Sequence, residues 1–275
     1  MGQSNNDIHI DCDIFNETIS EIKDEFKDDF NKARSEILDF IKKGVKDKEQ
    51  SIRYIITWHL SCLKENEEPI DDILKILLDV MKNDKDQWVR QRAAYVLYEM
   101  DEKLDSIKDE LIELLRSSPN GEVRGEAAYL LGKINDPKII PLIFSKLKKE
   151  SNDNARSLIA WSLSYFGKEA SVTVPALIDL LKNDKSEVVR WRSALSLRLI
   201  GDKKAIPALI QQLTGDNCGD VRSSAANALG EMRAIEAIPH LNKSLLNDKH
   251  ENTRLSHNGN WFNGRSCCYF DTNTC

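Results

Sequence analysis

The sequence lacks most of the features that mark membrane proteins, secreted proteins and common enzymes. It contains no apolar run that approaches the ~20 residues needed to cross a bilayer, and no signal peptide precedes its first predicted helix. It has no glycine-rich phosphate loop, no nucleophile elbow and no placeable Ser/His/Asp constellation. We therefore expect no catalytic residues, no cofactor and no membrane partner.

A basic excess is also missing. The formal net charge is −6, and residues 1–50 hold 13 acids and 8 bases, so the rest of the chain is nearly neutral. Proteins dedicated to nucleic acid normally carry a clear positive excess, because contacts to phosphates dominate their binding. Nucleic acid is therefore an unlikely partner on charge alone.

Paired cysteine spacings are absent from the repeated part of the chain described below. Six cysteines are scattered along the sequence, which favours a cytoplasmic protein with reduced thiols: Cys12, Cys62, Cys218, Cys267, Cys268 and Cys275. The last three could imitate a zinc set together with His257. However, a six-residue gap after adjacent cysteines is not a usual ligand spacing. We therefore predict no metal site.

The sequence does contain a repeat. A Val-Arg pair, replaced once by Ala-Arg, returns at intervals of 34, 32, 34 and 32 residues: Arg90, Arg124, Arg156, Arg190 and Arg222. A fixed period of this size is typical of a helical solenoid. The third, fourth and seventh positions after the arginine are small or apolar, as in Ala127, Ala128 and Leu131. This spacing predicts a first helix that buries one narrow stripe, where a neighbouring helix can approach closely.

A second helix is predicted in each repeat. Prolines recur 34, 32 and 32 residues apart and precede apolar runs: Pro141, Pro175, Pro207 and Pro239. Proline lacks an N–H group and is tolerated only in the first turn of a helix, so each one marks a helix start. Two helices of this length cannot bury both apolar faces alone, and stacking on neighbouring repeats completes the core.

Acidic residues stand six positions before several of the repeated arginines. They are Asp84, Asp184 and Asp216, with Asp248 as a fourth if Arg254 opens another repeat. An acid and an arginine at the same point of each repeat can form a ladder of charge-assisted hydrogen bonds between repeats. We therefore assign the five repeated arginines and these aspartates a structural role.

At these residues the chain resembles the HEAT-like repeats named after the phycobilisome (bilin) lyases. The resemblance lies in V-R-x-x-A-A-x-x-L-G, here Val123–Gly132, and in A-I-P-x-L-I, here Ala205–Ile210, and covers roughly residues 84–254. It implies an all-α, right-handed solenoid of about six helix pairs. Such repeats occur in chromophore lyases, hydroxylases, DNA-repair enzymes and plain scaffolds, so the motif specifies the fold better than the function.

The predicted organisation has three parts. Residues 1–46 form a polar N-terminus and an acidic amphipathic capping helix, continuous or broken near Asp28 and Asp29. Residues 47–254 form the solenoid, with first helices beginning near residues 86, 120, 153, 186 and 218. Residues 255–275, rich in Asn and Gly, are predicted to be an irregular tail.

An aromatic column is the best candidate for a binding surface. Five residues after the arginine position, four successive repeats carry Trp58, Tyr95, Tyr129 and Trp161. The helical wheel turns this position away from the buried stripe and predicts outward side chains, whereas the size of the rings favours partial cover. We expect one edge of each ring to pack on the adjacent repeat and the other to face solvent. Further candidate contacts are Trp191, Arg92 and Arg192.

Two other kinds of site can be considered, a basic concave surface and a di-iron centre. Lysines of the second helices are expected on the concave side, where solenoids usually bind: Lys146, Lys148, Lys149 and Lys182. Hydroxylases with HEAT-like repeats hold two irons through His-Glu pairs beside the repeated arginine. Here that place reads Gly125-Glu126, Ser157-Leu158 and Trp191-Arg192, without histidine.

The sequence thus favours a non-enzymatic scaffold, monomeric and cytoplasmic. It would bind another protein through its concave face or through the aromatic column. The alternative, implied by the resemblance, is a bilin-lyase-like enzyme or a chaperone-like subunit, which would need a partner subunit and a chromophore pocket. A DNA binder of the repair-enzyme type is a third reading, which the charge balance disfavours.

Overall fold

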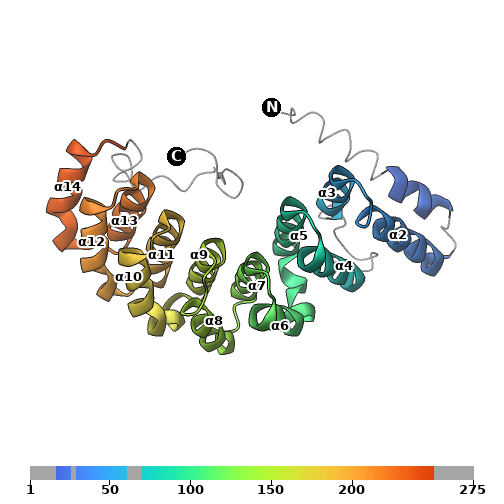
Figure 1. Cartoon of the computed structure of the whole chain (residues 1–275), viewed down its shortest axis with the longest axis horizontal. Coiled ribbons are helices and arrows are strands. Elements are labelled where there is room, and N and C mark those ends of the chain that lie inside the picture. Colours follow the sequence, from blue (N-terminus) through green and yellow to red (C-terminus); the bar gives the residue numbers. More distant parts are fainter. Residues whose placement is uncertain (1–16, 26–28, 61–69, 251–275) are drawn as a thin grey trace. The chain divides into compact units, whose positions relative to one another are not determined.

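The computed structural model describes residues 17–25, 29–60 and 70–250, and every regular element in these ranges is helical (Figure 1). The chain divides into two compact units, Met1–Tyr165 and Phe166–Cys275, which are described separately below. Residues 84–246 contain no strand, so the prediction of an all-α solenoid is confirmed. Among the described residues, no helix is long and apolar enough to cross a membrane.

The first unit alternates the predicted first and second helices. After a helical stretch at residues 17–25 come α2 (Phe30–Gly44), α3 (Gln50–His59), α4 (Ile70–Asn83), α5 (Gln87–Glu99), the 3-10 helix η2 (Asp101–Ile107), α6 (Lys108–Ser117), α7 (Gly121–Ile134), η3 (Pro137–Ile139), α8 (Ile140–Leu147) and α9 (Asp153–Ser162).

The second unit continues the same order after η4 (Leu163–Thr173), which contains the boundary between the units. Its helices are α10 (Val174–Asn183), α11 (Glu187–Ile200), η5 (Lys203–Ala205), α12 (Ile206–Gly215), α13 (Gly219–Glu231), η6 (Ile235–Ala237) and α14 (Ile238–Asn247). The first helices α5, α7, α9, α11 and α13 begin within one residue of the predicted positions.

Helix α2 covers the start of the repeat array. It begins after Asp29, whose side chain accepts a hydrogen bond from the backbone N–H of Lys32 (3.1 Å), as an N-cap does. The helix packs against α3 and α4 and buries Ile37 and Ile41. The structure therefore has a separate helix beginning after Asp29, as in the predicted alternative with a break at this place.

The helices of the first unit form two layers. The first helices α3, α5, α7 and α9 stand in one row and the second helices α4, α6 and α8 in another (Figure 1). Glycines allow α7 and α9 to come close. A Cβ atom on Gly125 would lie 2.8 Å from Ala155 Cα, and one on Gly132 would lie 2.7 Å from the Ser162 carbonyl oxygen. Because the first helices pack so closely, their row lies on the inner side of the curve of this unit (Figure 1).

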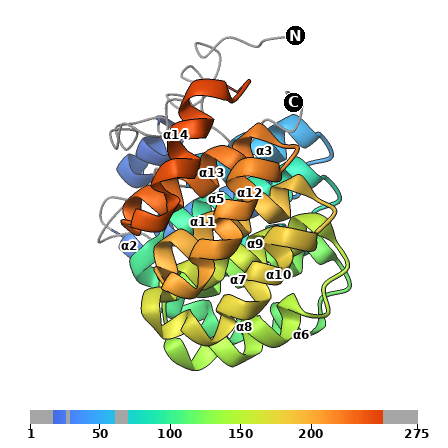
Figure 2. The same cartoon turned by 90° about the vertical axis from the view of Figure 1, so that its left-hand side faces the viewer.

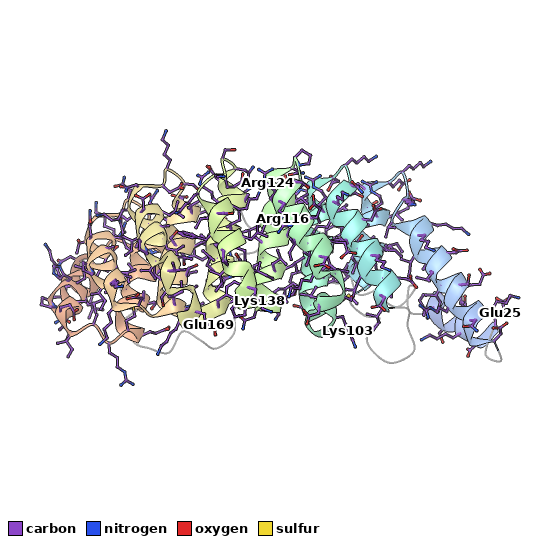
Figure 3. All side chains as sticks on the ribbon, turned by 90° about the horizontal axis from the view of Figure 1, so that it is seen from below. Glu25, Lys103, Arg116, Arg124, Lys138 and Glu169 are labelled. Atoms are coloured by element: carbon purple, nitrogen blue, oxygen red, sulfur yellow. The ribbon has the colours of Figure 1, made fainter. Side chains whose placement is uncertain are left out.

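The repeated prolines stand where the second helices begin. Pro141, Pro175, Pro207 and Pro239 each occupy the first or second position of α8, α10, α12 and α14, as predicted. The turns from first to second helix carry the 3-10 helices. In the first unit, Lys103 of η2 and Lys138 of η3 mark this edge, and Arg124 marks the opposite edge, where second helices lead into first helices (Figure 3).

The second unit is built in the same way. Helix α13 packs against both α11 and α12, and α14 packs against α12 (Figure 2). The small-residue stripe of α13 is buried, with Ala225 and Leu229 fully covered. On α12, Leu209 and Leu213 are fully covered as well. Each helix pair therefore completes the core of the preceding pair, as expected for stacked repeats.

The repeated arginines form a ladder along one edge. In each case one terminal nitrogen of the guanidinium donates to the backbone carbonyl six residues earlier, as Arg190 does to Asp184 O (3.0 Å). In Arg124, Arg190 and Arg222, the Nε and the other terminal nitrogen donate to both carboxylate oxygens of the acid that opens the next repeat. Arg190 binds Asp216 in this way, at 2.7 and 2.9 Å. Arginine therefore joins two repeats, because its planar fork of donors fits a carboxylate. In Arg156, Nη2 donates to Asp153 Oδ1 of its own helix (2.7 Å).

The same bidentate contact recurs in three other pairs of the ladder: Arg53–Asp84, Arg124–Glu150 and Arg222–Asp248. Arg53 and Glu150 are the members that the repeated sequence positions did not include. Arg90 differs, because Ser118 stands where the next repeat should supply an acid. Its Nη2 donates instead to Glu122 on α7, at 2.8 Å.

Each acid of the ladder also shapes the turn that follows it. Asp216 Oδ1 accepts from the backbone N–H of Cys218 (2.8 Å), and Asp184 Oδ1 accepts from that of Ser186 (2.9 Å). The hydrogen bonds from Arg222 hold the pKa of Asp248 below its ordinary value. The bond to Asp216 in turn raises the pKa of Arg190. Both shifts favour the charged, paired state.

We predict that Arg190→Ala lowers the free energy of unfolding by about 3 kcal/mol, because Asp216 is buried and would lose its charged partner. Urea unfolding followed by circular dichroism measures this. Lys182→Ala, an exposed change on α10, is the control and should stay within about 0.5 kcal/mol of the parent. Equal stability of the Arg190 variant and the parent would show that the ladder does not hold the repeats together.

Acid should weaken the same rungs. The pKa of Asp248 is lower in the folded chain than in the unfolded chain, so its contribution is present above about pH 4 and is lost as pH falls through the lower, folded value. We expect the loss of stability between pH 7 and pH 3 to be smaller in Arg222→Ala than in the parent. Urea titrations of both proteins at the two pH values test this, and identical losses would contradict it.

Candidate partner-binding surface

Seven aromatic side chains lie on the first-helix row of the first unit and in the turn after it. The predicted column contributes Trp58 on α3, Tyr95 on α5, Tyr129 on α7 and Trp161 on α9, and the structure adds Tyr54, Tyr98 and Tyr165. We call this set the aromatic surface. All of its members except Tyr129 are partly exposed.

The N-terminal part of the aromatic surface is organised around Arg92. The rings of Trp58 and Tyr95 are stacked nearly parallel, with centroids 6.1 Å apart. The guanidinium of Arg92 lies 3.7 Å from the centre of the Trp58 ring and 4.8 Å from that of Tyr54. It also donates a hydrogen bond to the Tyr54 hydroxyl. A cation over aromatic faces attracts their ring quadrupoles and holds these rings in place.

The C-terminal part of the aromatic surface is a cluster of tyrosines. The Tyr98 and Tyr129 rings are stacked with centroids 5.1 Å apart, and Tyr165 meets Tyr129 edge to face at 5.8 Å. The Tyr165 hydroxyl donates to the Tyr129 hydroxyl (3.2 Å). The edge of Trp161 in turn contacts Tyr165, with centroids 6.3 Å apart. This part of the aromatic surface therefore presents both tyrosine hydroxyls and aromatic ring edges.

The predicted column is not a row of outward rings. Trp58, Tyr95 and Trp161 are half-buried, with partial cover as expected from their size, but Tyr129 is buried and only 6% exposed. The wheel angle was misleading because adjacent first helices come close enough for a ring between them to be covered from both sides. Within the column only Trp58 and Tyr95 stack on each other in the contacts described here. Tyr129 and Trp161 instead contact Tyr98 and Tyr165, which lie outside the column.

Arg92 and Arg192 also differ from the expectation that they add outward basic contacts. Both are buried, at 8% and 9% exposed. Burial lowers the pKa of Arg92, against the opposing effect of its bond to Tyr54. In the second unit, Arg192 lies 5.3 Å from the ring centre of its neighbour Trp191, which is half-buried. Their long stems fill the space beside the rings, as amphipathic side chains do.

The lysines of the second helices do not lie on the inner side of the first unit. Lys146, Lys148 and Lys149 belong to α8 and its C-terminal end, in the outer row (Figure 1). The prediction that they face the concave side is wrong for this unit. The closer packing of the first helices, which follows from their small residues, decides which row is inside.

The tyrosine hydroxyls of the aromatic surface are protonated hydrogen-bond groups. Burial raises the pKa of Tyr95 and of Tyr165, so both hydroxyls stay protonated and act as hydrogen-bond groups at neutral pH. Within the described ranges, no group of three His, Cys, Asp or Glu side chains is placed to hold a metal ion. The zinc-like set of His257, Cys267, Cys268 and Cys275 lies outside the described residues, as does the predicted tail, residues 255–275.

Sequence reasoning missed three of the seven rings. Tyr98 stands eight residues after the repeated arginine, at the position that Gly132 and Gly230 occupy in other repeats. A tyrosine in place of a glycine at the contact between first helices is a signal that could have been read. Tyr54 and Tyr165 have no such pattern, and only the packing brings them to this surface.

The fold and the ladder define a helical-repeat protein. A family profile described as HEAT repeats matches residues 109–197 and 174–256, which together span more than half of the chain. The chain belongs to the HEAT-repeat family.

Two solved structures illustrate the likeness of fold. YibA of Escherichia coli is 19% identical, with a TM-score of 0.54 over 93% of this chain and 96% of its own. The complex of CpcE and CpcF of phycocyanin lyase from Nostoc sp. PCC7120 is 18% identical, with a TM-score of 0.50 over 74% of this chain and 80% of that one. A search of curated proteins finds no significant match. At such identities the likeness shows the fold alone.

The burial of Tyr129 predicts that its ring contributes to the stability of the first unit as a core side chain does. Tyr129→Ala should lower the free energy of unfolding by about 3–5 kcal/mol, as removal of a core aromatic does. Tyr129→Phe keeps the ring and loses only the hydrogen bond with Tyr165, so it should cost about 1 kcal/mol. Chemical unfolding measures both. A small effect of the alanine variant would mean that this ring is not part of the core.

Proposed function

We propose that this HEAT-repeat protein is a non-enzymatic scaffold that binds another protein through the aromatic surface of its first unit. The observation that carries the proposal is the composition of that surface. Tryptophan, tyrosine and arginine are the residues most enriched among those that dominate binding energy at protein interfaces. Here they occupy adjacent first helices with their rings held in fixed contacts.

The fixed geometry supports binding for a second reason. Ordering a side chain on association costs roughly 0.5–1.5 kcal/mol for each rotamer-rich group. The Trp58, Tyr95 and Arg92 side chains already hold one another, so this cost is reduced before a partner arrives. A partner that covers their exposed edges would gain hydrophobic contact, and the tyrosine hydroxyls could form hydrogen bonds with it.

The alternatives have less support. The resemblance to the phycocyanin lyase complex is a likeness of fold, and no feature of the described residues adds a chromophore site to it. DNA binding would need a basic excess that the nearly neutral repeats lack. The aromatic surface, by contrast, has the composition and the fixed ring contacts of a protein interface.

The proposal predicts that substitutions in the aromatic surface weaken binding of the partner protein. The full chain would be cross-linked in cells of its source organism and the captured proteins identified by mass spectrometry. Trp58→Ser and Trp161→Ser should each weaken binding of the identified partner about 30-fold, which corresponds to a loss of about 2 kcal/mol at a dominant interface residue. Calorimetric titration with the purified partner measures the change.

The matched control changes the other row of helices. Lys148→Ser and Lys149→Ser are exposed substitutions at the end of α8 and should leave the partner's affinity unchanged. Thermal unfolding of each variant shows whether it is folded at the temperature of the binding measurement. If the partner binds the tryptophan variants normally but is lost with the lysine variants, the binding surface lies on the second helices and the proposal is wrong.

A further inference from the structure

The aromatic surface runs across the first helices and not along any one of them. Its rings come from α3, α5, α7, α9 and the turn after α9, and these helices stand side by side in one row (Figure 1). Packed helices are about 8–10 Å apart. The close contacts of Gly125 and Gly132 with α9 place α7 and α9 toward the short end of that range. A ligand that contacts every helix of this row therefore needs one anchor about every 8–10 Å, over about 24–30 Å in total.

The exposed parts of the rings are spread along this whole length. They belong to Tyr54 and Trp58 on α3, Tyr95 and Tyr98 on α5, Trp161 on α9 and Tyr165 in the turn that follows α9. On α7 the ring of Tyr129 is buried, so this helix offers the smallest aromatic area. The ligand must therefore be long and thin, with anchors that reach rings on different repeats.

Positive charge already lies against the rings. The guanidinium of Arg92 is 3.7 Å from the centre of the Trp58 ring, and Lys133 Nζ is 4.3 Å from the centre of the Tyr98 ring. A lysine or arginine of the partner would bring a second positive charge to a ring that already binds one, and the two cations would repel each other. Anchors that are neutral and apolar fit these rings better.

The hydroxyl groups of the aromatic surface favour a ligand that offers hydrogen-bond acceptors. The Tyr54 hydroxyl accepts a hydrogen bond from Arg92, so its own O–H proton can be donated to a ligand. Backbone carbonyl groups are such acceptors when they are not used within the secondary structure of the ligand itself. This condition favours an extended peptide over a helical one.

Of the usual peptide conformations, polyproline II matches this spacing. It has three residues per turn and rises 3.1 Å per residue, so a given side repeats about every 9 Å, and it has no internal hydrogen bonds. An α-helix instead repeats every 5.4 Å and uses its own carbonyl groups. A peptide that binds as an added β-strand needs the edge of a sheet, and the described residues contain no strand.

We propose that the part of the partner bound by the aromatic surface is a proline-rich segment of about 8–10 residues in the polyproline II conformation, with proline at every third position. This inference rests on the proposed function. Each proline ring would lie against the rings of one repeat, and the carbonyl groups between prolines would accept from tyrosine hydroxyls. Such a segment is preformed, so it loses little conformational entropy on binding.

Two synthetic peptides of identical composition test the spacing. One consists of four Pro-Ser-Leu triplets, and the other has the same residues with its four prolines together at one end. Titration of the full chain, followed by tryptophan fluorescence, should show the triplet peptide binding about 10-fold more tightly, because only its prolines recur at the spacing of the helices. This comparison uses the parent protein alone, so it stays valid if a variant does not fold.

Variants of the protein locate the bound peptide. Trp58→Ser and Trp161→Ser should each weaken binding of the triplet peptide about 10-fold, because each removes the rings of one anchor position. The matched control is Trp88→Ser. Trp88 is an exposed tryptophan at the start of α5 that lies outside the aromatic surface, so this variant should bind like the parent.

Several results would overturn the inference. Equal affinity of the two peptides is one, and tighter binding of an amphipathic helical peptide of the same length is another. If the partner captured from cells depends on Trp58 and Trp161 but neither synthetic peptide binds, the proposed function stands and the polyproline II inference is wrong. If the captured partner binds the two tryptophan variants normally, the proposed function itself is wrong.

Discussion

The bidentate contact between an arginine of one repeat and an acid of the next is the interaction on which the rest of the structure depends. A single guanidinium binds a carboxylate across the repeat boundary and a carbonyl within its own repeat, as Arg222 does with Asp248 and Asp216. The acid also fixes the turn into the next first helix. Each rung therefore sets the position of the following helix pair, and the apolar stripes then meet in register.

Close packing of the first helices follows from this register and creates the aromatic surface. Glycine and alanine at the contacts between α7 and α9 bring neighbouring helices together. Large rings that point into the grooves between such helices cannot lie freely in solvent, so Tyr129 is buried and Tyr98 stacks on it. The proposed binding surface is in this sense a product of repeat stacking, because its rings come from four successive first helices and the turn after the last of them.

Much of the fold could be read from the sequence because it rests on local rules. Proline at the start of second helices, the small-residue stripe and the 32- or 34-residue period each depend on a few neighbouring residues. The alternation of helices and the starts of α5, α7, α9, α11 and α13 followed from these patterns. The alignment of acids and arginines suggested a ladder, but it did not show that Arg90 would bind Glu122 where Ser118 interrupts the pattern.

The sequence by itself determined that the chain is an all-α array of repeats, and that small and apolar residues at helical spacing form the buried stripe of each first helix. Only the tertiary structure decided which helix row lies inside, how far the rings are covered, and that Arg92 stacks on Trp58 and Tyr54. The physical reason is the range of the interactions involved. Helix periodicity is fixed by residues three or four apart, whereas the burial of a ring or a guanidinium depends on side chains about 35 residues away, in the next repeat.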